Sequence, residues 1–349
     1  MSADSRESAT GRAGGLSGMV WLTWRQHRWA LLSCLAMTAV LVGWMVYLSI
    51  DMTRLYHQCH DMQCPPYSTQ HAALFNGWGP VLQSEILGLV VQYMPLLIGV
   101  FIGVPVLSRE HEQRTLLLAW SQDVSPVRWL WTKLTLLGLF VVTLTAAVAA
   151  VTDHLAHVHA DITGASLFGD KVFPITGMLP LAGSVCWFAV GVALGAVIRR
   201  TLPAIFGVIA GYVGLLLGIQ WRYPTLMTPA SFYLHPDQPG PLASDPNALV
   251  VNGDFDIAPD SVSNLFYASG REVTATDLFR MCPELSDHPS GTMIPDCIAR
   301  NQLMTLVTYQ PSSRIPEFHG IVAGGYLGLA AVALAAVWLI VRRTSLSAG

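Results

Sequence analysis

The sequence has few charged residues. Asp, Glu, Lys and Arg make up 12% of its 349 residues, where a soluble domain carries about 25%. None of them falls in six apolar windows: residues 29–50, 86–107, 134–152, 175–198, 202–219 and 321–341. Each window is long enough to cross the ~30 Å apolar core of a bilayer as a helix. The pattern excludes a soluble enzyme, a nucleic-acid-binding protein and a secreted disulfide scaffold, and predicts an all-α membrane protein with six transmembrane helices.

Motifs for nucleotide and zinc chemistry are also missing. No G-x-x-x-x-G-K-[ST] loop occurs, so the chain has no P-loop to hold ATP phosphates. His111-Glu112 begins a zinc-protease motif, but Thr115 stands where the second histidine is required. We therefore expect no catalytic residue and no cofactor bound by this chain.

A histidine run leaves one metal site open as an alternative. His154, His157 and His159 lie between Asp153 and Asp161, and imidazole is a common metal ligand. His154 and His157 share a helical face, which His159 joins only if the helix ends. Such a run more often marks a solvated helix end, and we expect no metal here.

The six windows contain no charged residue and no histidine. Ion-coupled carriers usually place such a group at mid-membrane. The most polar groups available are Gln92, Tyr93, Thr143, Thr145, Tyr212 and Tyr326. A pathway lined by these groups and by the aromatic residues Trp44, Phe101, Phe188 and Phe206 suits an amphipathic or apolar substrate rather than a bare ion. The energy for transport must then come from elsewhere.

The distribution of basic residues predicts the orientation. Lys and Arg remain on the cytoplasmic side, and 12 of the 19 lie there if the N-terminus is inside, against 5 of the 22 acidic residues. Both termini are then cytoplasmic, and residues 220–320 form a large, mostly irregular extracellular domain. The polar residues 1–18 are expected to be disordered, and Met19 is an alternative start. Spans one to five occupy residues 19–219, and residues 321–349 hold span six with a short tail.

Four of the six cysteines fall on the predicted outer side, where oxidation is permitted. They are Cys59, Cys64, Cys282 and Cys297. We favour the local pairs Cys59–Cys64 and Cys282–Cys297; pairing between the two loops, and free thiols or a metal site, remain open alternatives.

The inner loop at residues 108–133 has the most informative pattern. Glu110 and Arg114 are spaced i, i+4, and an apolar stripe follows, which predicts an amphipathic helix at the membrane surface. Ser125 is a suitable N-cap and Pro126 a suitable first residue for a second helix that enters span three. Two helices joined in this way are able to transmit a push from a cytoplasmic partner into the membrane.

This loop resembles that of the permease subunits of bacterial type-2 ABC (ATP-binding cassette) transporters. The matching residues are Arg109, Glu110, Glu112, Thr115, Val124, Ser125 and Lys133. A Gram-positive subgroup with a Leu-Ala-Trp-Thr-Gln-like loop is more similar still, through residues 118–124, the Arg-Arg-Thr-Leu-Pro-Ala turn at 199–204 and Tyr-Gln-Pro-Ser-Ser-Arg at 309–314. Two positions depart from the family: Arg114 replaces a glycine, and Pro126 replaces a basic residue.

The resemblance implies a function and a set of coupling residues. The chain is expected to be the permease of an ATP-driven exporter in a bacterial cell membrane. ATP and Mg belong to a separate ATPase subunit, and a second permease, either the same chain or a sister chain, completes the pathway in contact with membrane lipid. Coupling would use Arg109, Glu110, Glu112, Arg114, Thr115, Ser125, Arg128 and Lys133. The alternative is a membrane-embedded sensor or enzyme that uses the extracellular domain.

Overall fold

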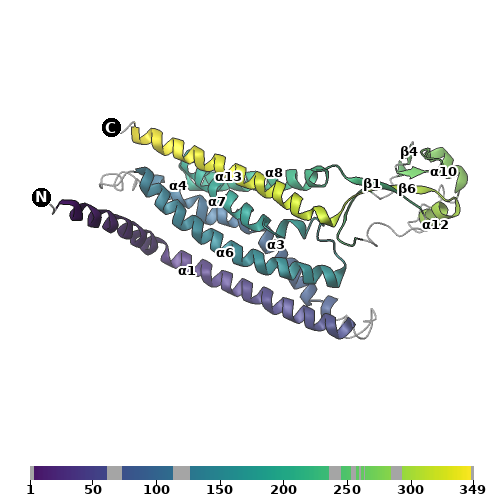
Figure 1. Cartoon of the computed structure of the whole chain (residues 1–349), viewed down its shortest axis with the longest axis horizontal. Helices are drawn as coiled ribbons and strands as arrows, with labels where there is room; N and C mark the ends of the chain where they lie inside the picture. Colours follow the sequence, from purple (N-terminus) through teal and green to yellow (C-terminus); the bar gives the residue numbers. More distant parts are fainter. Residues whose placement is uncertain are drawn as a thin grey trace. The chain divides into compact units, whose positions relative to one another are not determined.

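The structure is a computed structural model that describes residues 4–60, 73–112, 126–235, 245–252, 257–258, 261–262, 264–283 and 293–346. The chain divides into two compact units (Figure 1). The first, which we call the helical unit, comprises residues 1–162, 171–217 and 319–349. The second, the sheet unit, comprises residues 163–170 and 218–318.

Long apolar helices form almost all of the helical unit. They are α1 (Asp4–His60), α3 (Pro80–Ile98), the π-helix η1 (Gly99–Gly103), α4 (Pro105–Glu112), α6 (Pro126–Thr163), α7 (Leu179–Ile198), α8 (Thr201–Arg222) and α13 (Ile315–Leu346), with a 3-10 turn η2 (Phe173–Ile175) before α7. Proline stands at or next to the first residue of α3, α6 and α7, where its missing N–H costs nothing. Six helices in the described residues are long and apolar enough to cross a membrane, which confirms the six predicted spans.

Helix α1 is longer than its apolar window. It runs unbroken from Asp4 to His60, although we expected residues 1–18 to be disordered. Span one accounts for Leu31–Gln58 of it. A helix that is already nucleated adds residues easily, and this gives a physical reason for its extension into the polar N-terminal segment.

Helix α7 is the centre of the helical unit. Its span window is 61% buried, against 11% for the window in α1, and it is apolar on all sides, as a buried helix must be. One face of α7 packs with α4, α6 and α13 through residues such as Phe188, Leu134 and Val337. Another face packs with α8 and α13 around Trp187 and Tyr212.

Glycines bring α7 into backbone contact with the segment from η1 to α4. A Cβ atom at Gly103 would lie 2.7 Å from the Phe188 carbonyl oxygen, and one at Gly195 would lie 2.6 Å from that of Val104. Gly191 faces the carbonyl of Gly99 still more closely. The Gly191-x-x-x-Gly195 step therefore packs against this chain's own span two. The close approach coincides with η1, a π-helix of the kind that often marks a functional site in a helix.

The sheet unit has a four-stranded antiparallel sheet centred on β6 (Met304–Gln310). Strand β1 (Ala230–Leu234) pairs along one edge of β6, while β2 (Leu249–Asn252) and β5 (Leu265–Phe266) share the other. The remaining elements are the β3–β4 pair (Ile257–Ala258 and Ser261–Val262), α10 (Ala275–Met281), α12 (Met293–Arg300) and the short turns η3 (Tyr223–Thr225) and η4 (Ser312–Arg314). We expected a mostly irregular segment here. The difference arises because β1, β2 and β5 are short segments that become strands by pairing with β6.

A disulfide lies in the core of the sheet unit. Cys282 and Cys297, both fully buried, are bonded to each other with their Cα atoms 6.1 Å apart. They join the end of α10 to α12 beside Leu265, Leu278 and Leu303. Cys64 and the side chain of Cys59 lie outside the described residues.

The Tyr309–Arg314 motif bonds the segment that follows α8. The buried Gln310 side chain donates to the carbonyl oxygens of Pro224 at 3.1 Å and Met227 at 2.8 Å. The Arg314 guanidinium donates to the Thr228 carbonyl at 2.8 Å and to the Gln310 side chain at 2.9 Å. This motif therefore ties β6 to the residues that follow α8.

Candidate functional site

Two carboxylates on the last turn of α4 reach two different helices. Glu110 and Glu112 are two positions apart, so their side chains leave the α-helix about 200° apart. Glu110 contacts α6 and Glu112 contacts the start of α8. We call this region of the helical unit, where α4 ends, α6 begins and the α7–α8 turn lies, the α4 end. Figure 1 shows the start of α1 and the end of α13 at the same end of the unit.

Glu110 forms a buried ion pair with Lys133. The Lys133 ammonium lies 2.5 Å from a Glu110 carboxylate oxygen, and the side chains are only 6% and 17% exposed. The same ammonium donates to the Val106 carbonyl at 3.3 Å and lies 5.4 Å from the Trp129 ring centre. Within the described part of the chain, the second Glu110 oxygen has no hydrogen-bond partner. Lys133 is thus the main compensation for a buried negative charge.

Glu112 binds the first residue of α8. Its two carboxylate oxygens accept hydrogen bonds from the Thr201 backbone N–H at 2.8 Å and from the Thr201 hydroxyl at 3.0 Å. The Ser108 hydroxyl lies 3.0 Å from the same Thr201 hydroxyl. The bond from the Thr201 backbone is the main reason that the pKa of Glu112 is lowered, and the positive end of the α8 dipole acts in the same direction.

Five of the eight coupling residues expected from the sequence lie in the described part of the α4 end. Arg109, Glu110 and Glu112 lie on α4, Lys133 on α6, and Arg128 is exposed near the start of α6. Arg114, Thr115 and Ser125 lie outside the described residues, and Glu110 is paired with Lys133 rather than with a neighbour on its own helix. Ser108 and Thr201 are not among the coupling residues expected from the sequence. For Thr201 a signal is present, because it directly follows Arg199-Arg200 and precedes an apolar window.

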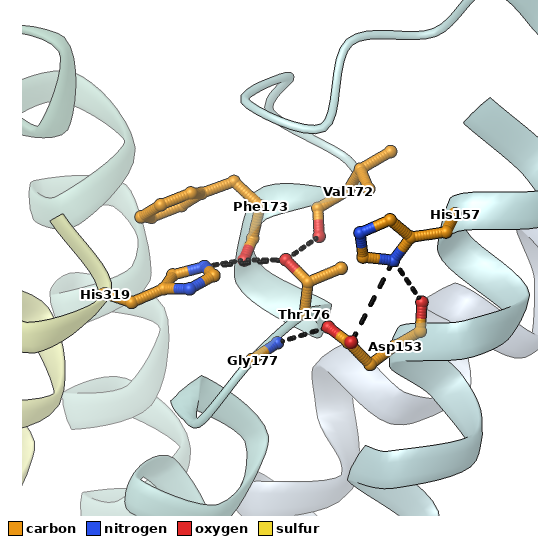
Figure 2. Close-up of polar contacts among 7 residues, drawn as sticks. All are labelled: Asp153, His157, Val172, Phe173, Thr176, Gly177 and His319. Atoms are coloured by element: carbon orange, nitrogen blue, oxygen red, sulfur yellow. Dashed lines mark hydrogen bonds and ion pairs between the residues drawn. The ribbon is translucent and has the colours of Figure 1, made fainter. Parts of the chain in front are cut away.

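A second polar network lies at the other end of α6. Figure 2 shows Asp153 beside the turn that precedes α7, where its carboxylate accepts a hydrogen bond from the Gly177 N–H at 2.8 Å. His319 of α13 reaches the same turn: its Nε2 lies 3.4 Å from the Phe173 carbonyl oxygen and 3.5 Å from the Thr176 hydroxyl. Its ring stacks on Phe173 with the ring centres 4.7 Å apart. We call this network of α6, α13 and the turn before α7 the latch.

Gly177 in the latch has no room for a side chain. Its φ is +59°, a backbone conformation that favours glycine. A Cβ atom there would also lie 2.5 Å from the Nδ1 atom of His319. The turn therefore packs directly on α13.

The histidines His157 and His159 of the predicted run make separate contacts. His157 Nδ1 lies 2.7 Å from the Asp153 carbonyl oxygen, one turn earlier on α6. His159 Nδ1 lies 2.8 Å from the Ser84 hydroxyl of α3. In the described segments no three His, Cys, Asp or Glu side chains are grouped so that they could hold a metal ion.

Several of the polar side chains expected along the pathway meet in the middle of the helical unit. The Tyr212 hydroxyl donates to the Gln92 carbonyl oxygen, and the Tyr212 ring lies 6.1 Å from that of Tyr93 and 5.3 Å from that of Trp187. Tyr326 packs in the same cluster. Thr143 and Thr145 instead bond carbonyl groups of their own helix.

The chain belongs to the family described as "ABC-2 membrane transporter related", which matches residues 35–222, more than half of its length. A second family, described as "Domain of unknown function (DUF8319)", matches residues 225–315, within the sheet unit. No curated protein and no solved structure matches the chain. Together with its six apolar helices, the family makes this chain a multi-pass membrane protein of the ABC-2 permease type.

Proposed function

We propose that this chain is the permease subunit of an ATP-driven exporter and works with a separate ATP-binding subunit. The observation that carries the proposal is the α4 end, where one short helix is bonded to two transmembrane helices by Glu110 and Glu112. It includes the first part of residues 108–128, the segment that the family resemblance assigns to the ATPase contact. ATP and Mg are then bound by the partner, because this chain has no P-loop.

In the proposed mechanism, the Glu110 and Glu112 carboxylates transmit the movement of the ATPase to the transmembrane helices. Closure of the ATPase dimer displaces residues 108–128, and a rigid α4 carries the displacement to α6 through Lys133 and to α8 through Thr201. Movement of α6 strains the latch, because Asp153 is on the same helix as Lys133. Opening of the latch would release α13 and the turn before α7, and so give access to the pathway from the other side.

The arrangement in the cell follows from the same proposal. The α4 end and both termini face the cytoplasm of a bacterium, and the sheet unit, with its Cys282–Cys297 disulfide, faces outward. A second permease, a copy of this chain or a sister chain, completes the pathway within membrane lipid. An amphipathic or apolar substrate suits the Tyr212 cluster, which carries hydroxyl groups and aromatic rings but no charge.

Purification of the tagged chain from its native membranes in mild detergent tests the proposal. We expect a stoichiometric partner with a P-loop, and ATP hydrolysis that vanadate inhibits. A homogeneous preparation without an ATP-binding subunit would overturn the proposal and favour a membrane-embedded sensor or enzyme.

Reversal of the charge at Glu112 should uncouple the transporter. Glu112→Lys places a cation at the positive end of the α8 dipole and removes both bonds to Thr201, so substrate-stimulated ATP hydrolysis should fall about tenfold, within the usual range of coupling between sites. Arg128→Glu should act in the same direction. Membrane insertion should be unchanged, because neither residue lies in an apolar window. Glu85→Lys, at an exposed position of α3, is the control; equal loss in that variant would contradict the prediction.

Removal of the Asp153 carboxylate should loosen the latch. In Asp153→Ala the Gly177 N–H loses its acceptor, so the amide of Gly177 should exchange its hydrogen about tenfold faster, as expected when a local opening becomes easier. Hydrogen-exchange mass spectrometry of the peptide around residues 173–178 measures this rate. His154→Ala, the next position on α6, should leave the rate unchanged. Unaltered exchange in Asp153→Ala would mean that other contacts hold the turn closed.

A further inference from the structure

His319 is a buried titratable side chain in the latch. Its exposed fraction is 8%, and Figure 2 shows its ring directed at the turn that holds Phe173, Thr176 and Gly177. The Phe173 carbonyl oxygen can only accept a hydrogen bond, so the His319 Nε2 atom, 3.4 Å away, is the nitrogen that carries the proton. The closed latch therefore fits a neutral imidazole that is protonated at Nε2 and unprotonated at Nδ1.

The second ring nitrogen of His319 faces the backbone of Gly177. A Cβ atom at Gly177 would lie 2.5 Å from Nδ1 and 2.8 Å from the adjacent ring carbon Cε1. In the described part of the chain Nδ1 has no hydrogen-bond acceptor. A second proton would therefore sit on a nitrogen without a partner, in a site with little access to water. Burying a charge without a partner is costly, so protonation of His319 opposes the closed latch.

Most of the surroundings of His319 carry no charge. The turn at residues 172–177 and helix α7 after it contain no acidic or basic side chain. Lys171, just before the turn, and Glu317, two positions before His319 on α13, are both exposed. Water and salt therefore screen both of them from the buried ring.

Asp153 on α6 supplies the negative charge that acts on the His319 ring. Both oxygens of this carboxylate already have neighbours. One accepts the Gly177 N–H at 2.8 Å, and the other lies 3.9 Å from Nδ1 of the exposed His157. The charge that would compensate a protonated His319 is thus on the same carboxylate that holds the turn closed.

We propose that His319 makes the latch a pH-sensitive switch, closed while the imidazole is neutral and open when it is protonated. A protonated ring gains a partner in one of two ways. It takes the Asp153 carboxylate from the Gly177 N–H, or it moves out to water. In both cases the turn before α7 loses a contact that holds it against α6 or α13.

The direction of the pH dependence follows from the burial of the ring. Water stabilises a charged imidazole better than the closed site does, so the open latch binds the additional proton more readily and acid shifts the equilibrium toward it. The closed latch is fully favoured above the range in which histidine titrates, at roughly pH 6–7, and is lost as the pH falls through that range.

The switch has a consequence for transport. In the proposed orientation the latch lies at the outer end of the helical unit, so the protons would come from outside the cell. An acidic exterior would then favour the state in which the pathway is open outward. The inference adds a regulator to the proposed function, and the pH response of the latch itself needs no ATP-binding subunit.

Hydrogen exchange of the purified, unchanged chain in detergent tests the switch. The peptide around residues 173–178 is followed at about pH 7.5 and about pH 5.5, on either side of the histidine range, and the rates are corrected for the intrinsic pH dependence of amide exchange. We expect the corrected exchange to be about tenfold faster at the lower pH, as for a local opening that acid makes easier. Equal corrected rates at the two pH values would overturn the inference.

Two glutamine variants assign the response to one histidine. His319→Gln retains an N–H near the position of Nε2, which can still donate to the Phe173 carbonyl, but its side chain cannot become charged. Its corrected exchange should be the same at both pH values. The matched control is His157→Gln, which removes the exposed histidine beside Asp153 and should keep the response. A response that persists in His319→Gln, or that disappears in His157→Gln, overturns the inference.

A buried cysteine supplies a second measurement in a chain that keeps His319. Val172 is 8% exposed, so Val172→Cys should react slowly with a water-soluble maleimide while the latch is closed. Met178→Cys, at a position that is 53% exposed, corrects for the effect of pH on the thiol itself, and peptide mapping separates both from the native cysteines. The labelling rate of Val172→Cys relative to Met178→Cys should rise about tenfold at the lower pH. A constant ratio would show that the turn stays closed in acid, against the inference.

Both measurements use this chain alone, so they separate the switch from the proposed function. Absence of an ATP-binding partner would overturn the function and leave the pH response intact. Absence of the pH response would overturn the switch and leave the function standing.

Discussion

Replacement of Lys133 by methionine is expected to lower the free energy of unfolding by about 3–5 kcal/mol, the usual effect of removing one partner from a buried ion pair. The methionine is similar in shape but leaves the Glu110 carboxylate without its cation. Glu110 is only 17% exposed, and one of its oxygens already lacks a hydrogen-bond partner in the described structure. Denaturant titration of the purified chain in detergent measures the change.

A double variant separates the stability of the pair from its role in coupling. Lys133→Met with Glu110→Gln leaves no buried net charge, so it should recover most of the lost stability. The link from α4 to α6 is still broken, and substrate-stimulated ATP hydrolysis should remain low. Lys171→Met removes an exposed cation from the same unit and should change stability little. Equal instability of the single and double variants would show that the ion pair is not what holds α4 against α6.

Gly191→Ala is expected to destabilise the helical unit by about 1–3 kcal/mol, the usual cost of overpacking a well-packed core. The new methyl group would meet backbone atoms of span two: the Gly99 carbonyl oxygen, the Val104 nitrogen at 3.0 Å and the Gly103 Cα at 3.1 Å. Backbone atoms cannot rotate away as a side chain does, so α7 and span two must move apart. The thermal midpoint in detergent should fall accordingly.

Gly214→Ala provides the matched control for this prediction. Gly214 lies on α8, and a Cβ atom there would have no atom within 4 Å among those described. The same substitution should therefore leave the midpoint unchanged or raise it slightly, because alanine favours a helix. If both variants lose stability equally, the loss comes from helix propensity or lipid contacts, and the backbone contact of α7 is not its cause.

The six transmembrane helices could be predicted because a bilayer imposes a local rule: about 20 consecutive residues without charge. The start of α6 at Pro126 agrees with the same kind of local signal, a proline at the first helical position. The sheet was harder to predict. Strands β2 and β5 have only four and two residues, and each is defined by its pairing with β6 rather than by its own pattern.

In the candidate site, too, the local pattern is visible in the sequence but the contacts are not. The motif around Arg109, Glu110 and Glu112 marked α4 as important, but it did not indicate the partners of these residues. Glu110 pairs with a lysine 23 positions away, and Glu112 binds a threonine 89 positions away. The sequence indicates Asp153 only as a neighbour of a possible metal site, whereas in the structure its carboxylate accepts a hydrogen bond from the Gly177 N–H.

Composition and the placement of charge were enough to show a multi-pass membrane protein with six transmembrane helices and with arginine concentrated in its short loops. These features follow from the cost of placing charge in a bilayer, which acts on neighbouring residues of the chain. Tertiary structure decided which surfaces meet. The Gly191-x-x-x-Gly195 step packs within the chain, Glu110 and Glu112 diverge to two helices, and Arg199 and Arg200 remain exposed at the α7–α8 turn. These facts depend on contacts between residues far apart in the sequence, and no local pattern specifies them.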